Sequence, residues 1–81
     1  MSWTVIPLLM LNPGEEGEVI QIDGGWGIVR RLAELGIYPG AIVRMMNKSW
    51  GPVVILVSGV RIAIGRGMAR RILVRPIRRS L

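Results

Sequence analysis

The side chains that most often carry out catalysis or bind metal ions are scarce in this sequence. Histidine and cysteine are both absent, which removes the most common general base, the most common transition-metal ligand and every thiolate. The remaining nucleophile candidates are serines and a single lysine, Lys48. A serine needs a base within hydrogen-bonding reach to become nucleophilic, and no histidine can act as one. We therefore predict that the protein is not an enzyme and that it uses no cofactor.

Carboxylates are the other groups that could take part in acid–base or metal chemistry. Glu15, Glu16, Glu18 and Asp23 lie close together in the first third of the chain. In a strand, Glu16 and Glu18 point to the same face, as paired acids would, but solvated glutamates have the same spacing. Sites for Fe²⁺ usually include imidazole or thiolate ligands, and these carboxylates match no known metal-binding spacing. We expect surface acids and no metal site.

The aromatic residues fall mainly outside the expected core strands. Phenylalanine is absent, and the three tryptophans, Trp3, Trp26 and Trp50, lie in the lead-in or in loops. One interpretation is that Trp26 and Trp50 each cover the small core as a lid. The other is that they anchor a docking surface, because Trp, Tyr and Arg dominate binding hot spots. On this second interpretation, the partner-binding residues are Trp26, Tyr38, Trp50, Arg61, Arg66 and Arg70.

Charge is divided unevenly along the chain. Up to residue 35, five acids and two arginines give a net charge of −3, and beyond it nine basic residues and no acid give +9, for a total of +6. A basic half of this kind attracts nucleic acid, anionic lipid or acidic protein. A small barrel that binds nucleic acid is therefore the alternative function, although such binders usually interleave aromatic and basic residues. The arginines that would form one basic face are Arg61, Arg66, Arg70, Arg71, Arg75, Arg78 and Arg79.

One short helix organises the elements that must position these residues. Apolar residues at three- and four-residue spacing over residues 28–35 predict a helix of about ten residues. Gly36 stops this helix, because glycine enters the left-handed conformation without a side-chain penalty. If Leu35 is the C-cap, Leu32 and Ile37 are the two positions that touch in a Schellman motif.

Turn residues divide the rest of the chain into short strands. Pro13-Gly14 and Pro39-Gly40 predict type II turns, and Ser58-Gly59 predicts a two-residue hairpin turn with Gly59 at its second position. Asp23 is a candidate cap for the start of the helix. The strands expected from period-two apolar patterns cover residues 17–22, 41–46, 53–57, 60–64 and 71–75, with a short edge strand at 8–11 and a single helical turn at 65–70.

These elements predict a mainly β fold: a small, SH3-like, partly open barrel of about five strands with one short α-helix. We expect a lead-in over residues 1–7, the domain over 8–75 and a basic tail over 76–81 that frays. The longest apolar run spans five residues, whereas a membrane span needs roughly 20, so we expect a soluble protein. An open β-edge would allow self-association into a homo-oligomer.

The order of the motifs resembles that of the ferrous iron transport protein A (FeoA) family over roughly residues 8–74. The same small domain occurs at the C-terminus of iron-dependent repressors of the diphtheria-toxin-repressor type. Trp26, Gly67 and Arg78-Arg79 depart from the family pattern. The matching pieces, in order, are Leu11, Pro13-Gly14-Glu15, Gly17-Glu18-Val19, the block from Arg31-Leu32 through Leu35-Gly36-Ile37 to Pro39-Gly40, the hairpin at Gly59–Ile64, and Ala69, Ile72 and Val74.

The resemblance implies a small cytoplasmic protein that acts on a membrane-embedded partner. Members of the family are thought to regulate the GTPase-permease (FeoB-like) of the same iron uptake system. The resemblance therefore implies an accessory protein of ferrous iron uptake, working in the cytoplasm with peripheral contact to the inner membrane face. It assigns the docking role to no particular residue, and it implies no nucleic-acid partner.

Overall fold

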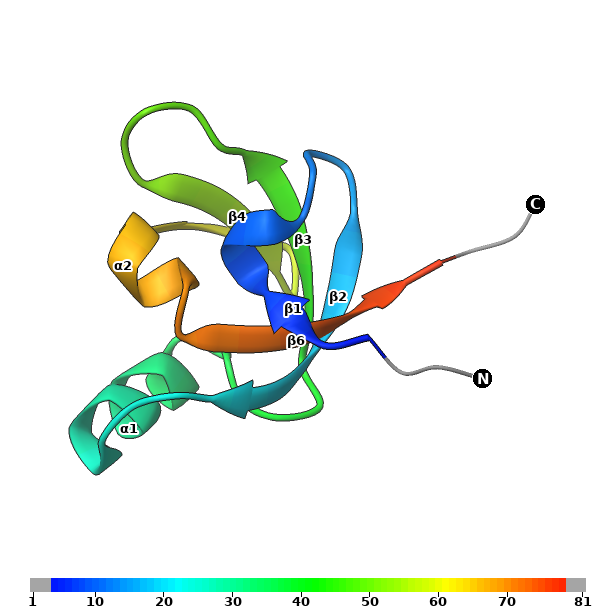
Figure 1. The fold of residues 1–81 in the computed structure, drawn as a ribbon. Coiled ribbons are helices and arrows are strands. Elements are labelled where there is room, and N and C mark those ends of the chain that lie inside the picture. The colour runs from blue at the N-terminus through cyan, green and yellow to red at the C-terminus, as the bar shows by residue number, and fades with distance from the viewer. Residues whose placement is uncertain (1–3, 79–81) are drawn as a thin grey trace.

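The structure, a computed structural model, describes residues 4–78 of the chain. Six antiparallel strands form one sheet in the order β1-β6-β2-β3-β4-β5, which curls into a small, partly open barrel (Figure 1). The strands are β1 (Ile6–Pro7), β2 (Glu16–Ile22), β3 (Ile42–Asn47), β4 (Val53–Val57), β5 (Val60–Ile64) and β6 (Ile72–Ile77). The helical elements are the 3₁₀ helix η1 (Leu8–Met10), α1 (Trp26–Glu34) and α2 (Arg66–Ala69). The predicted mainly β, SH3-like fold is confirmed, with one strand more than expected.

One apolar core fills the barrel. Val19, Val43, Ile55 and Val74 come from four different strands and are fully buried. Among the described residues, no polar or charged side chain is buried in this core. The strand pairing shifts register once in β2 and once in β3, and such irregularities bend strands and increase their twist. The bends let a sheet of short strands close around a core that apolar side chains alone fill.

The predicted helix end is confirmed in detail. Gly36 has φ of +89°, which is the left-handed conformation expected of it. The N–H of Ile37 donates to the carbonyl of Leu32 at 2.9 Å, and the N–H of Gly36 donates to the carbonyl of Ala33 at 2.9 Å. These are the two hydrogen bonds of a Schellman motif. They fix the direction in which the chain leaves α1 toward β3.

Both predicted Pro-Gly turns are confirmed, and each is attached to the sheet. Gly14 and Gly40 have φ of +92° and +99°. In each turn the carbonyl of the residue before proline accepts a 2.9 Å hydrogen bond from the N–H of the residue after glycine. In addition, the N–H of Gly14 donates to Met45 in β3, and that of Gly40 donates to Val19 in β2. The turns therefore hold neighbouring strands in register as well as reversing the chain.

Two local predictions are wrong. Residues 8–11 contain η1 rather than an edge strand. Leu8 and Leu11 are both fully buried, and residues three apart share a face in a 3₁₀ helix but not in a strand. Asp23 does not cap α1, because the N-cap is Gly25 and no side chain bonds to the first turn.

The sheet extends past the predicted domain limits at both ends. β1 pairs Ile6 with Val74, inside the predicted lead-in, and β6 continues to Ile77, inside the predicted tail. The division of the chain at residues 7 and 75 stays a prediction, and residues 79–81 of the tail lie outside the described residues.

Helix α1 lies at one end of the barrel, beside α2 (Figure 1). Only one of its residues, Leu32, is buried, and Ile28, one turn earlier, is partly buried against the core. Within residues 4–78, no helix is long and apolar enough to cross a membrane.

A candidate docking groove between α1 and β5

An apolar groove of about 560 Å³ separates α1 from the segment that runs from β5 into α2. It lies where the last strand of the sheet meets the helix, and its volume is in the range of small ligand sites. The side chains that make its walls are aliphatic, with one basic residue, Arg31, at the rim. The apolar walls consist of Ile28, Leu32 and Leu35 on the α1 side and of Ala63, Ile64 and Met68 on the other.

The groove exists because α1 has more apolar surface than the core can cover. Ile28, Leu32 and Leu35 lie four and three residues apart and so share one face of the helix. Leu32 is 4% exposed, whereas Leu35, the C-cap residue, is 47% exposed. Ile28 is intermediate between them and packs against the edge of the core. Part of the apolar face of α1 is therefore left uncovered.

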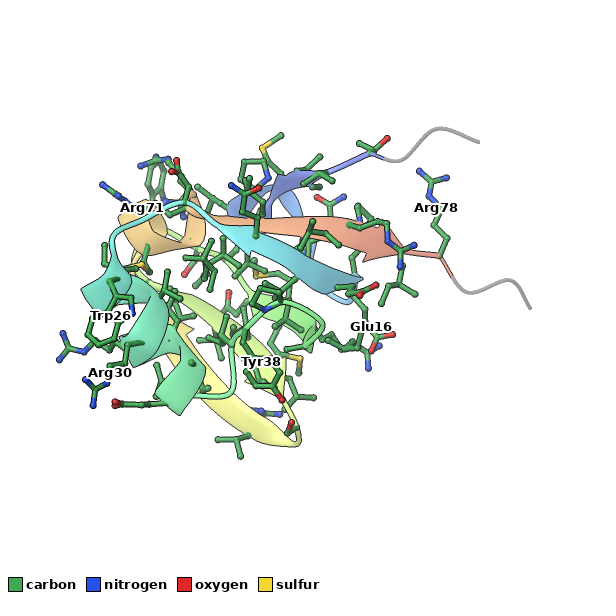
Figure 2. All side chains as sticks on the ribbon, turned by 90° about the horizontal axis from the view of Figure 1, so that it is seen from below. Glu16, Trp26, Arg30, Tyr38, Arg71 and Arg78 are labelled. Carbon is green, nitrogen blue, oxygen red and sulfur yellow. The ribbon has the colours of Figure 1, made fainter. Side chains whose placement is uncertain are left out.

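Trp26 stands at the N-terminal end of the same helix, 77% exposed. The guanidinium of Arg30 lies 5.4 Å from the centroid of its indole ring, a cation–π geometry. Arg30 also lies 3.7 Å from Glu34 in an exposed i, i+4 pair. Figure 2 shows Trp26 and Arg30 side by side on α1. The interpretation of Trp26 as a lid on the core is wrong, and its role as a docking anchor stays a prediction.

Trp50 is even more exposed, at 97%, so the lid interpretation is wrong here too. It lies in the loop between β3 and β4, next to a shallow pocket of about 290 Å³ that it shares with Lys48, Ser49 and Arg66. Arg66 donates to the backbone carbonyl of Ser49 at 2.6 Å, which connects this loop to the start of α2. Figure 1 shows the loop and α1 on opposite sides of α2.

The six predicted partner-binding residues therefore do not form one cluster. Tyr38 is half-exposed in the loop after α1 and lies apart from Trp26 (Figure 2). Trp50 and Arg66 share the second pocket, while Arg61 and Arg70 are exposed on β5 and at the C-cap of α2. Of these residues, Trp26 and Arg66 are adjacent in sequence to residues that line the groove, and the groove itself was not predicted.

The described arginines that were predicted to form one basic face come from β5, α2 and β6 and the residues that flank α2 and β6. Arg71 and Arg78 lie at opposite ends of β6 (Figure 2). Arg75 donates to the carboxylate of Glu18 at 2.5 Å, so part of the positive charge is neutralised within the fold. Arg79 lies outside the described residues. The positive charge is therefore spread over several elements, and one ion pair offsets part of it.

Glu15 and Glu18 have structural partners. Glu15 accepts a hydrogen bond from the N–H of Asn12 at 2.6 Å and so closes the first Pro-Gly turn, and Glu18 binds Arg75. Within residues 4–78, no group of three or more acidic, histidine or cysteine side chains lies together in a way that could hold a metal ion. No buried side-chain polar atom of the described part lacks a hydrogen-bond partner.

Comparison with known proteins places this geometry in context. The model of the family described as "FeoA domain" matches residues 6–76. The "Putative Fe(2+) transport protein A" of Methanocaldococcus jannaschii is 43% identical over 68 residues, covering 84% of this chain and 83% of that protein.

Solved structures of known proteins have a similar fold. A crystal structure of an iron uptake regulatory protein (FeoA) superposes with a TM-score of 0.86 at 40% identity, covering 91% of this chain and all of that one. IdeR of T. acidophilum shares the fold, with a TM-score of 0.80 at 24% identity over 93% of this chain and 35% of its own. The expected likeness to a domain of iron-dependent repressors is confirmed as one of fold.

Proposed function

Because the chain belongs to the FeoA family, we propose that it is a non-enzymatic accessory protein of ferrous iron uptake that docks on the cytoplasmic GTPase domain of the FeoB-like permease. The observation that carries the proposal is the apolar groove between α1 and β5. Exposed aliphatic side chains in a concave surface mark a site for a partner.

The composition of the groove supports a protein partner. Leu35, Ile28 and Met68 offer apolar contact area, and Arg31 at the rim and Trp26 at the end of α1 are of the types that dominate hot spots. Burial of one well-packed Trp in an interface is typically worth about 2 kcal/mol or more. A small groove flanked by such anchors suits a regulatory contact that forms and breaks.

Docking on this partner would place the protein in the cytoplasm, at the inner face of the membrane. The net charge of +6 favours that location, because anionic lipids of the cytoplasmic leaflet attract basic residues by about 1 kcal/mol for each residue near the surface. Trp50, at the tip of its loop, is suited to the same interface. Contact with lipid would be peripheral and secondary to the protein contact.

The test is a titration of the full chain with the purified GTPase domain of the permease from the same organism, by calorimetry. We expect association with a Kd of tens of micromolar or tighter, which corresponds to a binding free energy of about −6 kcal/mol or more negative. The variant Leu35→Glu should weaken binding at least 10-fold, because it places a charge in the apolar groove. Ile42→Glu is the matched control, since Ile42 is 42% exposed on β3, away from the groove. Absence of binding at these concentrations would refute the proposal.

Nucleic-acid binding is the alternative, and only the basic composition favours it, with a sequence pI of about 11.6. Titration of labelled RNA and DNA over a range of salt concentrations distinguishes the two. Phosphate contacts produce a steep fall of log affinity with log salt, whereas an apolar groove does not. A steep slope together with no effect of Leu35→Glu would favour this alternative.

A further inference from the structure

Strand β5 has one edge that pairs with nothing in the described structure. It is the last strand in the sheet order and pairs only with β4. The turn between them contains Ser58 and Gly59 with φ of +50° and +79°, the signs of a type I′ hairpin. In such a turn the flanking residues, Val57 and Val60, are hydrogen-bonded to each other.

The register of this hairpin determines which backbone groups point outward. Val60, Ile62 and Ile64 lie opposite Val57, Ile55 and Val53, and hydrogen-bonded pairs alternate with non-bonded ones in an antiparallel ladder. The N–H and C=O groups of Arg61 and Ala63 therefore face away from β4. Both residues are exposed, and within residues 4–78 neither has a backbone or side-chain hydrogen bond outside the ladder.

The apolar groove runs along this same edge. Ala63, Ile64 and Gly65 form one wall and α1 forms the other, and Figure 2 shows α1 beside the yellow ribbon of β5. A chain segment that enters the groove from this side would meet two kinds of surface at once. It would find unpaired backbone donors and acceptors on β5, and an aliphatic slot for a side chain between β5 and α1.

We propose that this edge accepts an extended segment of the GTPase domain, which adds to β5 as a seventh strand and inserts an apolar side chain into the groove. This inference rests on the proposed function and specifies its geometry. The segment bonds to the outward N–H and C=O groups of Arg61 and Ala63. Its residues alternate between apolar ones that face the groove and acidic ones that lie beside Arg61.

Other occupants fit less well. A helix laid in the groove would exclude water from the edge and leave four backbone groups unpaired, at about 1–3 kcal/mol each. Proline-rich helices bind in aromatic-lined grooves, whereas the walls here are aliphatic. A second copy of this chain would bring the same arginines to the contact, and like charges oppose such pairing. An acidic strand satisfies both the hydrogen bonds and the charge.

The other edge of the sheet is poorly suited to this role. β1 has two residues, and one of them is Pro7, which has no N–H to donate. A short edge strand with proline is a common protection against strand addition. Strand β5 has five residues and no proline, so the sheet leaves one of its two edges open to a partner.

The test is amide hydrogen exchange of the ¹⁵N-labelled full chain, free and with two probes. One probe is the purified GTPase domain, and the other is the peptide acetyl-Asp-Val-Glu-Ile-Asp-Val-amide. We expect exchange at Arg61 and Ala63 to slow at least 10-fold with each probe, while Ile62 and Ile64, already bonded to β4, change far less. The same peptide, N-methylated at the alternate residues whose N–H groups would face β5, should not slow exchange at Arg61 and Ala63.

A variant provides a second readout. Ala63→Pro removes an outward N–H without touching the β4 ladder, and should weaken binding of both probes about 10-fold. Ala63→Ser keeps the N–H and is the matched control. If Ala63→Pro does not fold, the exchange pattern of the unmodified chain still decides.

The outcomes separate the two proposals. Binding of the GTPase domain without protection at Arg61 and Ala63 would overturn strand addition and leave the proposed function standing. Protection by the peptide without binding of the domain would support strand addition at this edge and overturn the proposed function. Protection that rises with protein concentration in the absence of any probe would assign the edge to a second copy of the chain and overturn the inference.

Discussion

Gly17 provides a sharp test of how the barrel is packed. It is buried in β2, opposite β6, and a Cβ added there would lie 2.9 Å from Cγ2 of Val74 and 3.3 Å from Cδ1 of Leu11. The first distance is shorter than carbon atoms tolerate, and both neighbours are fully buried. The strands must therefore separate or Val74 must leave its rotamer, and overpacking of this kind costs about 1–3 kcal/mol. We expect Gly17→Ala to lower the Tm by roughly 5–20 °C, given a slope of 4–8 °C per kcal/mol for a domain of this size.

A double-mutant cycle measured by urea unfolding identifies the cause. Val74→Ala alone should cost about 2–3 kcal/mol, because it removes two buried methyl groups and leaves a cavity. Combined with Gly17→Ala, it should cost about 1 kcal/mol less than the sum, since Cγ2 of Val74 is no longer there to clash. Gly27→Ala is the control: no atom lies within 4 Å of the added Cβ, and alanine favours the helix by up to about 1 kcal/mol. A stable Gly17→Ala variant, or strictly additive costs, would refute this account of the packing.

Three further predictions concern the helix end, the ion pair and the exposed loop. Gly36→Ala should lower the free energy of unfolding by about 1–2 kcal/mol, because φ is +89° there. The control Gly51→Ala, which has open space around the added Cβ, should change it by less than about 0.5 kcal/mol. Equal losses in the two variants would contradict the left-handed assignment. Glu18→Ala should lower the free energy of unfolding by about 0.5–1 kcal/mol at low salt and by nearly nothing at 1 M NaCl, since Glu18 and Arg75 are each about one-third exposed. A loss of stability that salt does not reduce would contradict the ion-pair explanation. Trp50→Ala should change the stability by less than about 0.5 kcal/mol in thermal unfolding, because Trp50 is 97% exposed; a larger loss would mean that the ring packs on the fold.

The parts of the fold that were predicted correctly are those that short stretches of sequence determine. Gly36 has a positive φ because glycine, which has no Cβ, takes the left-handed conformation without strain. The two Pro-Gly turns and the hairpin at Gly59 follow from the same local chemistry. Strands β4 and β5 begin and end where they were predicted, because turn residues bound them on both sides.

The parts that were not predicted depend on what the chain packs against. Leu8 and Leu11 form a helical turn because both fill one side of the core, and a four-residue apolar segment alone does not distinguish that turn from a strand. Tryptophan is highly buried on average, yet Trp26 and Trp50 are exposed, and the described core consists of aliphatic side chains and Met45. Periodicity places Leu35 on the same helix face as Leu32, but it does not show how far neighbouring residues cover that face, and Leu35 is 47% exposed.

The helix end that the sequence predicts also borders the groove that was not predicted. Leu32 and Ile37 are both buried and are joined by the Schellman hydrogen bond, so α1 is anchored at its C-terminal end. Its first residue, Trp26, is 77% exposed, and Gly25 makes no side-chain cap there. Leu32 and Leu35, which precede Gly36, both line the groove, so the helix end that the Schellman motif fixes also fixes part of one groove wall. Gly36 therefore affects both the stability of the helix end and the shape of the groove between α1 and β5.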